Sequence, residues 1–182
     1  RSRMCAPIPA SKIAGTRTPM LGVNIGGLGF LTAVPSDRLA AALKLVWQGE
    51  FRYESRALIE AAGIGGGKKI KATALNDIVI SRGAASRLIA LDVSVNGEPI
   101  TRYRCDGLIV SSPTGSTAYS LAAGGAIVLP TAEVFALTPI CPHALSNRSI
   151  ILPLSATIRM KAITTEPATF LNADGKIAGE LV

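Results

Sequence analysis

The segment RLIALDVSVNGEPITRYRC, residues 87–105, is the clearest indication of fold class in this chain. Apolar and polar side chains alternate on both sides of Asn96-Gly97, and such alternation is typical of strands with one buried face. The Asn-Gly pair favours a tight type I′ turn, because both central residues of that turn take positive φ. The segment therefore predicts two antiparallel strands, 87–95 and 99–105, joined as a hairpin.

The chain on either side of this hairpin changes character at Gly49. Before Gly49, an apolar run over 20–25, a glycine-rich stretch and a helical pattern from Pro35 predict a strand, a loop and a helix. After it, β-branched segments separated by turn residues predict antiparallel sheet. We expect an α+β chain, with residues 1–49 as a remnant of an N-terminal α/β domain and residues 50–182 as a mostly antiparallel, β-sandwich-like domain. The expected strands of the second part are 52–62, 69–75, 77–81, 87–95, 99–105, 107–111, 149–153, 155–163, 168–172 and 176–182, with a short helix over 117–124.

Composition limits the class of protein. Of the 182 residues, 48% are hydrophobic and 17% charged, which indicates a packed globular protein. The net charge of +7 favours anionic ligands, but the basic residues are dispersed and only 4% of residues are aromatic, so nucleic acid is not indicated as a partner. No apolar run approaches the ~20 residues of a membrane span. Pro7 and Pro9 interrupt any apolar run of the kind found in a signal peptide. The three cysteines are widely spaced and there is one histidine, which indicates reduced thiols and no metal site. We expect a cytoplasmic protein.

A strand followed by hydroxyl-bearing residues occurs at residues 106–120, DGLIVSSPTGSTAYS. Serine and threonine hydroxyls donate and accept hydrogen bonds, and Gly115 lets the backbone approach another group closely. The loop suits a sugar, a phosphate or an amide as ligand; alternatively, its hydroxyls cap their own backbone. The residues by themselves leave both interpretations open.

Asn76 and Asp77 interrupt the apolar run ATALNDIVI, residues 72–80. In a strand the two side chains point to opposite faces. The pair is either a strand end or bulge, or a carboxylate and an amide presented to sugar hydroxyls through charge-assisted hydrogen bonds.

Other enzyme motifs are incomplete. Gly26, Gly27 and Gly29 lack the third glycine of a dinucleotide fingerprint, because Thr32 is at that position. Gly67-Lys68 lacks the Ser or Thr of a P-loop, and no G-x-S-x-G elbow accompanies His143.

Three motifs together resemble the NAD kinase family: GVNIGGLGFLT at residues 22–32, Asn76-Asp77, and the 106–120 segment followed by Gly124-Gly125. They occur in the family's order and spacing. The resemblance implies an α/β domain before a mostly β-sandwich domain. It also implies transfer of the γ-phosphoryl group of ATP, or of polyphosphate, with Mg as divalent metal ion, to the adenosine-ribose 2′-hydroxyl of NAD to give NADP, in a homodimer or homotetramer.

The resemblance also assigns residues to the NAD pocket. Asn76 and Asp77 would hold ribose hydroxyls, and Asp106 would contact the nicotinamide end. Residues 117–122 would line the adenine pocket, with Tyr119 offering an aromatic face. The full set expected to bind NAD is Phe30, Asn76, Asp77, Arg87, Arg104, Asp106, Thr114, Thr117, Ala118, Tyr119, Ser120, Leu121, Ala122, Cys141 and Lys176.

Three departures limit what the resemblance implies. Ala122 replaces a serine that bonds adenine in many members, and Lys176 is where glutamine is common. The family's catalytic Gly-Gly-Asp-Gly motif, whose aspartate activates the 2′-hydroxyl, does not occur before Met20. We therefore expect the NAD-binding, C-terminal portion of a NAD kinase, which alone binds NAD weakly and catalyses little, with no catalytic residue of its own. A non-catalytic NAD-binding module and a lipid-kinase relative are the alternatives.

Overall fold

The computed structural model describes residues 18–25, 34–83, 87–143, 148–163 and 168–181. They fall into two compact units, one of Gly15–Ser55 and one that contains Arg56–Val182. None of the helices in these described stretches combines the length and the apolar character that crossing a membrane requires.

The smaller unit contains two short strands and one helix. β1 (Val23–Asn24) and β2 (Val34–Pro35) pair in parallel, and β2 leads into the 3₁₀ turn η1 (Ser36–Arg38) and helix α2 (Leu39–Trp47). The helix ends before Gly49, whose φ of 76° is the left-handed conformation that glycine adopts without steric cost. The helix expected between Pro35 and Gly49 is confirmed.

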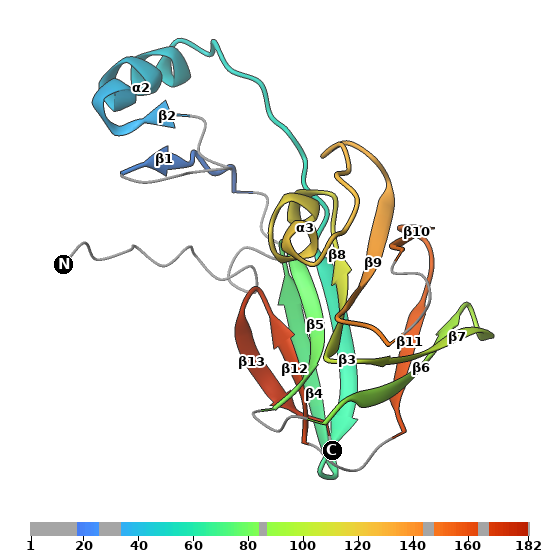
Figure 1. Ribbon diagram of the computed structural model, residues 1–182. Helices are drawn as coiled ribbons and strands as arrows, with labels where there is room; N and C mark the ends of the chain where they lie inside the picture. Colours follow the sequence, from blue (N-terminus) through green and yellow to red (C-terminus); the bar gives the residue numbers. More distant parts are fainter. Residues whose placement is uncertain (1–17, 26–33, 84–86, 144–147, 164–167, 182) are drawn as a thin grey trace. The chain divides into compact units, whose positions relative to one another are not determined.

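The larger unit consists of antiparallel sheets (Figure 1). A six-stranded sheet has the order β10-β9-β8-β5-β12-β13, a three-stranded sheet the order β11-β6-β7, and β3 pairs with β4. The fold class expected from the sequence is confirmed, as is the hairpin at Asn96-Gly97, where the φ angles are 52° and 92°. The strands are β3 (Ile59–Gly65), β4 (Lys68–Ala74), β5 (Asp77–Arg82), β6 (Ile89–Val95), β7 (Glu98–Cys105), β8 (Gly107–Ser111), β9 (Val134–Ile140), β10 (Ile150–Pro153), β11 (Ile158–Ala162), β12 (Thr169–Ala173) and β13 (Lys176–Glu180).

The core of this unit draws on alternate residues of several strands. Ile78 and Ile80 of β5 pack with Leu108 and Val110 of β8, and β6 contributes Ile89, Leu91 and Val93. All five residues of β8 are buried, as expected of a central strand. The end of β8 is therefore a rigid anchor for the loop that follows it.

Several elements differ from the sequence-based expectation. The strand expected over 20–25 is only Val23–Asn24, and the short strand β2 was not predicted. The strand expected from residue 52 begins only at Ile59, because the chain up to Ser55 belongs to the smaller unit. β9 is a strand that the sequence did not predict. Pro139 lies within it, and proline argues against an interior strand because it has no N–H for the ladder. β9 nevertheless pairs with both β8 and β10.

Candidate functional site

The Asn76-Asp77 pair and the hydroxyl-bearing residues 111–120, called the hydroxyl loop below, come together because β5 and β8 are neighbours. Their antiparallel register pairs Asp77, the first residue of β5, with Ser111, the last residue of β8. Directly opposed residues on antiparallel strands have Cβ atoms about 5 Å apart on the same face of the sheet. The two sequence motifs thus form one site at the end of the sheet.

The loop beyond β8 is held by its own serines. Ser112 Oγ donates to the Leu75 carbonyl at 2.6 Å and accepts the Gly115 N–H at 3.1 Å. Ser116 Oγ donates to the Pro113 carbonyl at 2.7 Å and accepts the Val128 N–H at 3.0 Å. These two hydroxyls bond to the backbone of the loop itself, at Pro113 and Gly115, and to the backbone of neighbouring segments, at Leu75 and Val128. They are therefore occupied within the protein, which is close to the simpler of the two interpretations of the motif.

Asp77 and Ser111 have unusual environments. The Asp77 side chain is almost fully buried, and this burial, with a smaller contribution from the nearby Asp174 carboxylate, raises the pKa of Asp77 to about 6. The Ser111 hydroxyl is also buried and has no hydrogen-bond partner among the described residues. A raised carboxyl pKa and an orphaned hydroxyl on one face of the sheet are typical of a ligand site.

A second group of predicted residues gathers at the other end of β8. The Arg82 guanidinium lies 2.6 Å from Asp106 Oδ1, and this hydrogen bond holds the pKa of Asp106 below its usual range. Asp106 N–H donates to the Ile140 carbonyl at 3.0 Å, immediately before Cys141. Arg104 joins the group because its carbonyl accepts the His143 N–H at 2.8 Å. Of the predicted set, this end of the sheet brings Asp106, Arg104 and Cys141 together.

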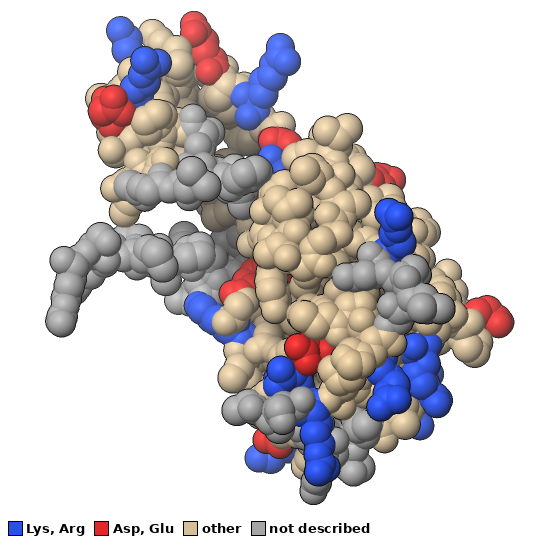
Figure 2. Space-filling model, viewed as in Figure 1, with Lys and Arg blue, Asp and Glu red and all other residues tan. Residues whose placement is uncertain are grey.

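The short helices after β8 present a mixed surface. η2 (Thr114–Thr117) is followed by α3 (Tyr119–Ala122). Ala118, between the two, is exposed, as are Tyr119, Leu121 and Ala122 on α3. Ser120 instead is buried, and its hydroxyl is 3.1 Å from Thr138 Oγ1, which is 2.7 Å from Ser149 Oγ. Figure 2 shows that the surface over α3 is mostly uncharged. Tyr119 is thus available as an aromatic face, whereas Ser120 anchors the helix.

The remaining predicted residues are placed as follows. Thr114 is buried and accepts a hydrogen bond from Arg56 Nη1 at 3.4 Å, and Thr117 is half-buried. Arg87 is exposed before β6, and Lys176 is exposed at the start of β13. Phe30 lies outside the described residues. The assignment of the whole set to NAD binding stays a prediction.

Sequence reasoning missed Arg82, Thr138 and Asp174. Arg82 ends an apolar strand and Thr138 lies inside the unforeseen strand β9, so neither carried a motif. The Asp174-Gly175 pair signalled only a turn, although Asp174 is in contact with residues 75–77. Asp77 and Asp174 are 97 residues apart in the chain, so no local sequence pattern predicts their contact.

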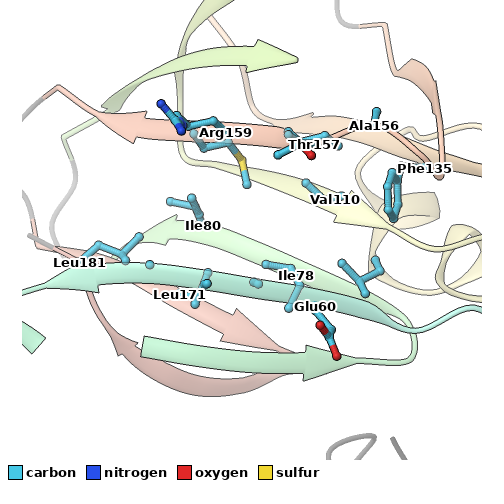
Figure 3. A pocket seen from close by; sticks show the side chains of 16 residues that line it. Glu60, Ile78, Ile80, Val110, Phe135, Ala156, Thr157, Arg159, Leu171 and Leu181 are labelled. Atoms are coloured by element: carbon cyan, nitrogen blue, oxygen red, sulfur yellow. The ribbon is translucent and has the colours of Figure 1, made fainter. Parts of the chain in front are cut away.

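Two further features bear on ligands. No three His, Cys, Asp or Glu side chains gather as a metal site in the part of the chain that the structure describes, so we assign no residue to magnesium. A cavity of about 470 Å³ lies between β3, β5, β8 and β11, with Glu60, Thr157 and Arg159 among its lining (Figure 3). None of the residues expected to bind NAD that the structure describes lines it.

Comparison with known proteins identifies similar chains. The family described as "ATP-NAD kinase C-terminal domain" matches residues 75–181. A NAD kinase of Geobacter metallireducens is 44% identical over 177 residues, which are 96% of this chain and 62% of the relative. The chain spans about three fifths of the length of the curated relatives it matches.

Two solved structures share the fold. Yeast NADH kinase complexed with NADH matches with a TM-score of 0.86 and 36% identity, over 92% of this chain and 50% of that one. An NAD kinase from Archaeoglobus fulgidus in complex with ATP matches with a TM-score of 0.75 and 27% identity, over 90% of this chain and 61% of that one. The order of the motifs along the chain and the fold therefore indicate the same family.

Proposed function

The chain belongs to the ATP-NAD kinase C-terminal domain family, and from this premise we propose that the protein phosphorylates the adenosine-ribose 2′-hydroxyl of NAD to give NADP. The observation that supports this most is the register of Asp77 with Ser111, which joins the Asn76-Asp77 pair to the hydroxyl loop. A carboxylate accepts hydrogen bonds from two neighbouring sugar hydroxyls with a geometry that few other ligands satisfy. The solved relative in complex with NADH agrees with a dinucleotide as ligand.

The described residues would bind and orient the nucleotide. Asn76 and Asp77 would hold the ribose, and the exposed ring of Tyr119 would lie against the adenine. Asp106, already ordered by Arg82, would contact the nicotinamide end. Holding the acceptor hydroxyl in place is a large part of phosphoryl-transfer catalysis, which relies on positioning and on stabilisation of charge.

Activation of the 2′-hydroxyl is proposed to need a group that these 182 residues do not supply. The chain contains no Gly-Gly-Asp-Gly sequence, and we assign no catalytic base among the described residues. ATP is the proposed phosphoryl donor, in keeping with the relative solved with ATP, and polyphosphate is the alternative donor. Magnesium would bind together with the phosphates of the donor, which is its usual mode of binding in kinases.

Formation of NADP tests the proposed activity. The protein, NAD and magnesium are incubated with ATP or with polyphosphate, and NADP is detected with an NADP-specific dehydrogenase. We expect NADP with at least one donor from the complete enzyme of which residues 1–182 are proposed to be the C-terminal portion, and NAD binding with little turnover from residues 1–182 alone. Absence of NADP formation by the complete enzyme with both donors would contradict the proposal.

Removal of the Asp77 carboxylate tests the site. Asp77→Ala is expected to weaken NAD binding by about 1.5–3 kcal/mol, the usual worth of a hydrogen bond to a charged group. That is roughly a tenfold to hundredfold rise in Kd by calorimetry. Asp92→Ala is the matched control, because Asp92 is a more exposed strand carboxylate paired with Arg102. Equal affinities of the two variants would show that Asp77 is only a strand-end residue.

We also propose self-association through the apolar surface that follows the loop. Ile127 and Leu129 are 72% and 74% exposed. Exposed apolar groups so close in sequence are typical of a protein interface. Light scattering should give the mass of a dimer or tetramer, reduced by Leu129→Asp; a monomer would contradict this.

A further inference from the structure

We propose that Asp174 is a positioning residue for NAD: its carboxylate fixes the backbone of residues 75–77, so that the side chains of Asn76 and Asp77 are presented to the ribose. The inference rests on the proposed function and deepens it. It assigns a role to a residue that the sequence indicated only as part of a turn.

The Asp174 carboxylate accepts hydrogen bonds from three consecutive N–H groups. Oδ2 is 2.9 Å from the Leu75 nitrogen, and Oδ1 is 2.8 Å from the Asn76 nitrogen and 3.3 Å from the Asp77 nitrogen. A neutral amide has only one acceptor oxygen, so it cannot reproduce this set. Hydrogen bonds to an ionised group are also stronger than neutral ones.

Asp174 is itself rigidly placed. It begins the turn between β12 and β13, where Asp174 and Gly175 have φ angles of 46° and 73°. Its own N–H donates to the Asp77 carbonyl at 3.1 Å, and the preceding residue, Ala173, pairs with Ile78 of β5. The turn is thus tied to β5 through Asp174 itself and through the residue before it.

The opposite side of residues 75–77 is held by Ser112. Its hydroxyl donates to the Leu75 carbonyl at 2.6 Å, and its N–H donates to the Asn76 carbonyl at 2.8 Å. Two turns therefore satisfy the backbone groups of the segment: the Asp174 turn accepts its N–H groups and donates to the Asp77 carbonyl, and Ser112 donates to the carbonyls of Leu75 and Asn76. The Asn76 amide and the Asp77 carboxylate take no part in these bonds and remain for a ligand.

Asp174 has a second effect through its charge. The strands that pair with β5 bring Ser111 of β8 and Ala173 of β12 beside the start of β5, and Asp174 is the charged group that the β12–β13 turn adds there. Its negative charge adds to the effect of burial in raising the pKa of Asp77 to about 6. Because a carboxylate is the stronger acceptor for ribose hydroxyls, NAD affinity should rise with pH as Asp77 ionises.

The test compares Asp174→Gly and Asp174→Asn with Asn96→Gly. Asn96 is a matched control, because it begins the β6–β7 turn with a φ of 52° and its Oδ1 accepts one backbone N–H, that of Thr157, at 2.9 Å. Glycine adopts the positive φ of either turn without strain, so both substitutions remove the side chain and keep the conformation of the turn. We expect Kd and KM for NAD to rise about tenfold to a hundredfold in Asp174→Gly, with kcat changing less, and about twofold or less in Asn96→Gly.

The pH profile separates positioning from simple loss of stability. In Asp174→Asn, which keeps the size of the side chain, the midpoint of the pH dependence of NAD binding should move to lower pH. The inference is overturned if the unmodified protein binds NAD and both Asp174 variants keep its affinity and pH midpoint. If the unmodified protein itself does not bind NAD, the proposed function is what fails.

Discussion

Gly115 lies against the backbone of Asn76 so closely that a Cβ at position 115 would overlap the Asn76 carbonyl oxygen. The glycine is therefore required by space and not by a positive φ. From the sequence, Gly115 suggested close approach to a bound group. The structure shows that the group approached is the backbone of the other motif, which fixes the distance between the hydroxyl loop and the Asn76-Asp77 pair.

Gly115→Ala is expected to destabilise the protein and loosen this contact. Backbone atoms cannot move aside as a flexible side chain can, so overpacking should cost about 1–3 kcal/mol in the free energy of unfolding. Urea denaturation measures this cost, and NAD affinity should fall in the same variant. Gly63→Ala is the control, because a Cβ there would lie 3.5 Å from Leu181 Cδ2, an ordinary contact. Equal stability of the two variants would contradict the argument.

The ionisation of Asp77 is expected to make the protein less stable as pH rises. Its pKa is about 6 in the folded state against 3.8 as the ordinary value, so between these pH values the folded state binds more protons than the unfolded state. The stabilisation is complete below pH 3.8 and is lost as pH rises through about 6. At about 1.4 kcal/mol for each pKa unit, the loss is on the order of 1–3 kcal/mol.

Asp77→Asn should remove this dependence. Unfolding by urea between about pH 3.5 and 7 should show the variant gaining stability relative to the unmodified protein as pH rises. Asp92→Asn should behave in the opposite sense, because the hydrogen bond from Arg102 lowers the pKa of Asp92. A flat difference between Asp77→Asn and the unmodified protein would show that Asp77 ionises normally.

Local patterns predicted the parts of this molecule that are local in origin. Asn96-Gly97 specifies a turn whatever surrounds it, and the alternation on both sides specifies strands; both are confirmed. The sequence did not predict β9, because proline is more typical of loops than of interior strands. β9 is a strand because it pairs with β8 and β10 on its two edges, and a local pattern does not contain that information. The hydrogen bonds of Asp174 to residues 75–77 could not be predicted for a related reason. The Asp-Gly pair predicts a turn, but it does not predict which distant segment the turn contacts.

Arg82 is expected to affect NAD binding through Asp106. Arg82→Ala removes the hydrogen bond at 2.6 Å and lets the pKa of Asp106 return toward its usual value, so the carboxylate is no longer held in one position. We expect NAD affinity to fall roughly threefold to tenfold, in line with the modest worth of partly exposed ion pairs. Arg102→Ala removes a similar pair, Asp92–Arg102, on the β6–β7 hairpin and should leave NAD affinity unchanged. Equal effects of the two variants on NAD affinity would contradict a role for Asp106 at the nicotinamide end.

Thr138 is expected to hold α3 in place through its hydroxyl. Its Oγ1 lies between the hydroxyls of Ser120 and Ser149, at 3.1 and 2.7 Å, so Thr138→Val leaves two hydroxyls short of a partner. Buried polar groups without partners cost about 1–3 kcal/mol, and this loss should appear in the free energy of unfolding. Because Ser120 follows Tyr119 in α3, NAD affinity should fall as well. Thr73→Val on β4, where the threonine is half-buried, is the control and should change the free energy of unfolding by less than about 0.5 kcal/mol. If Thr138→Val were as stable as the control and bound NAD equally well, the hydroxyl chain would have no part in placing α3.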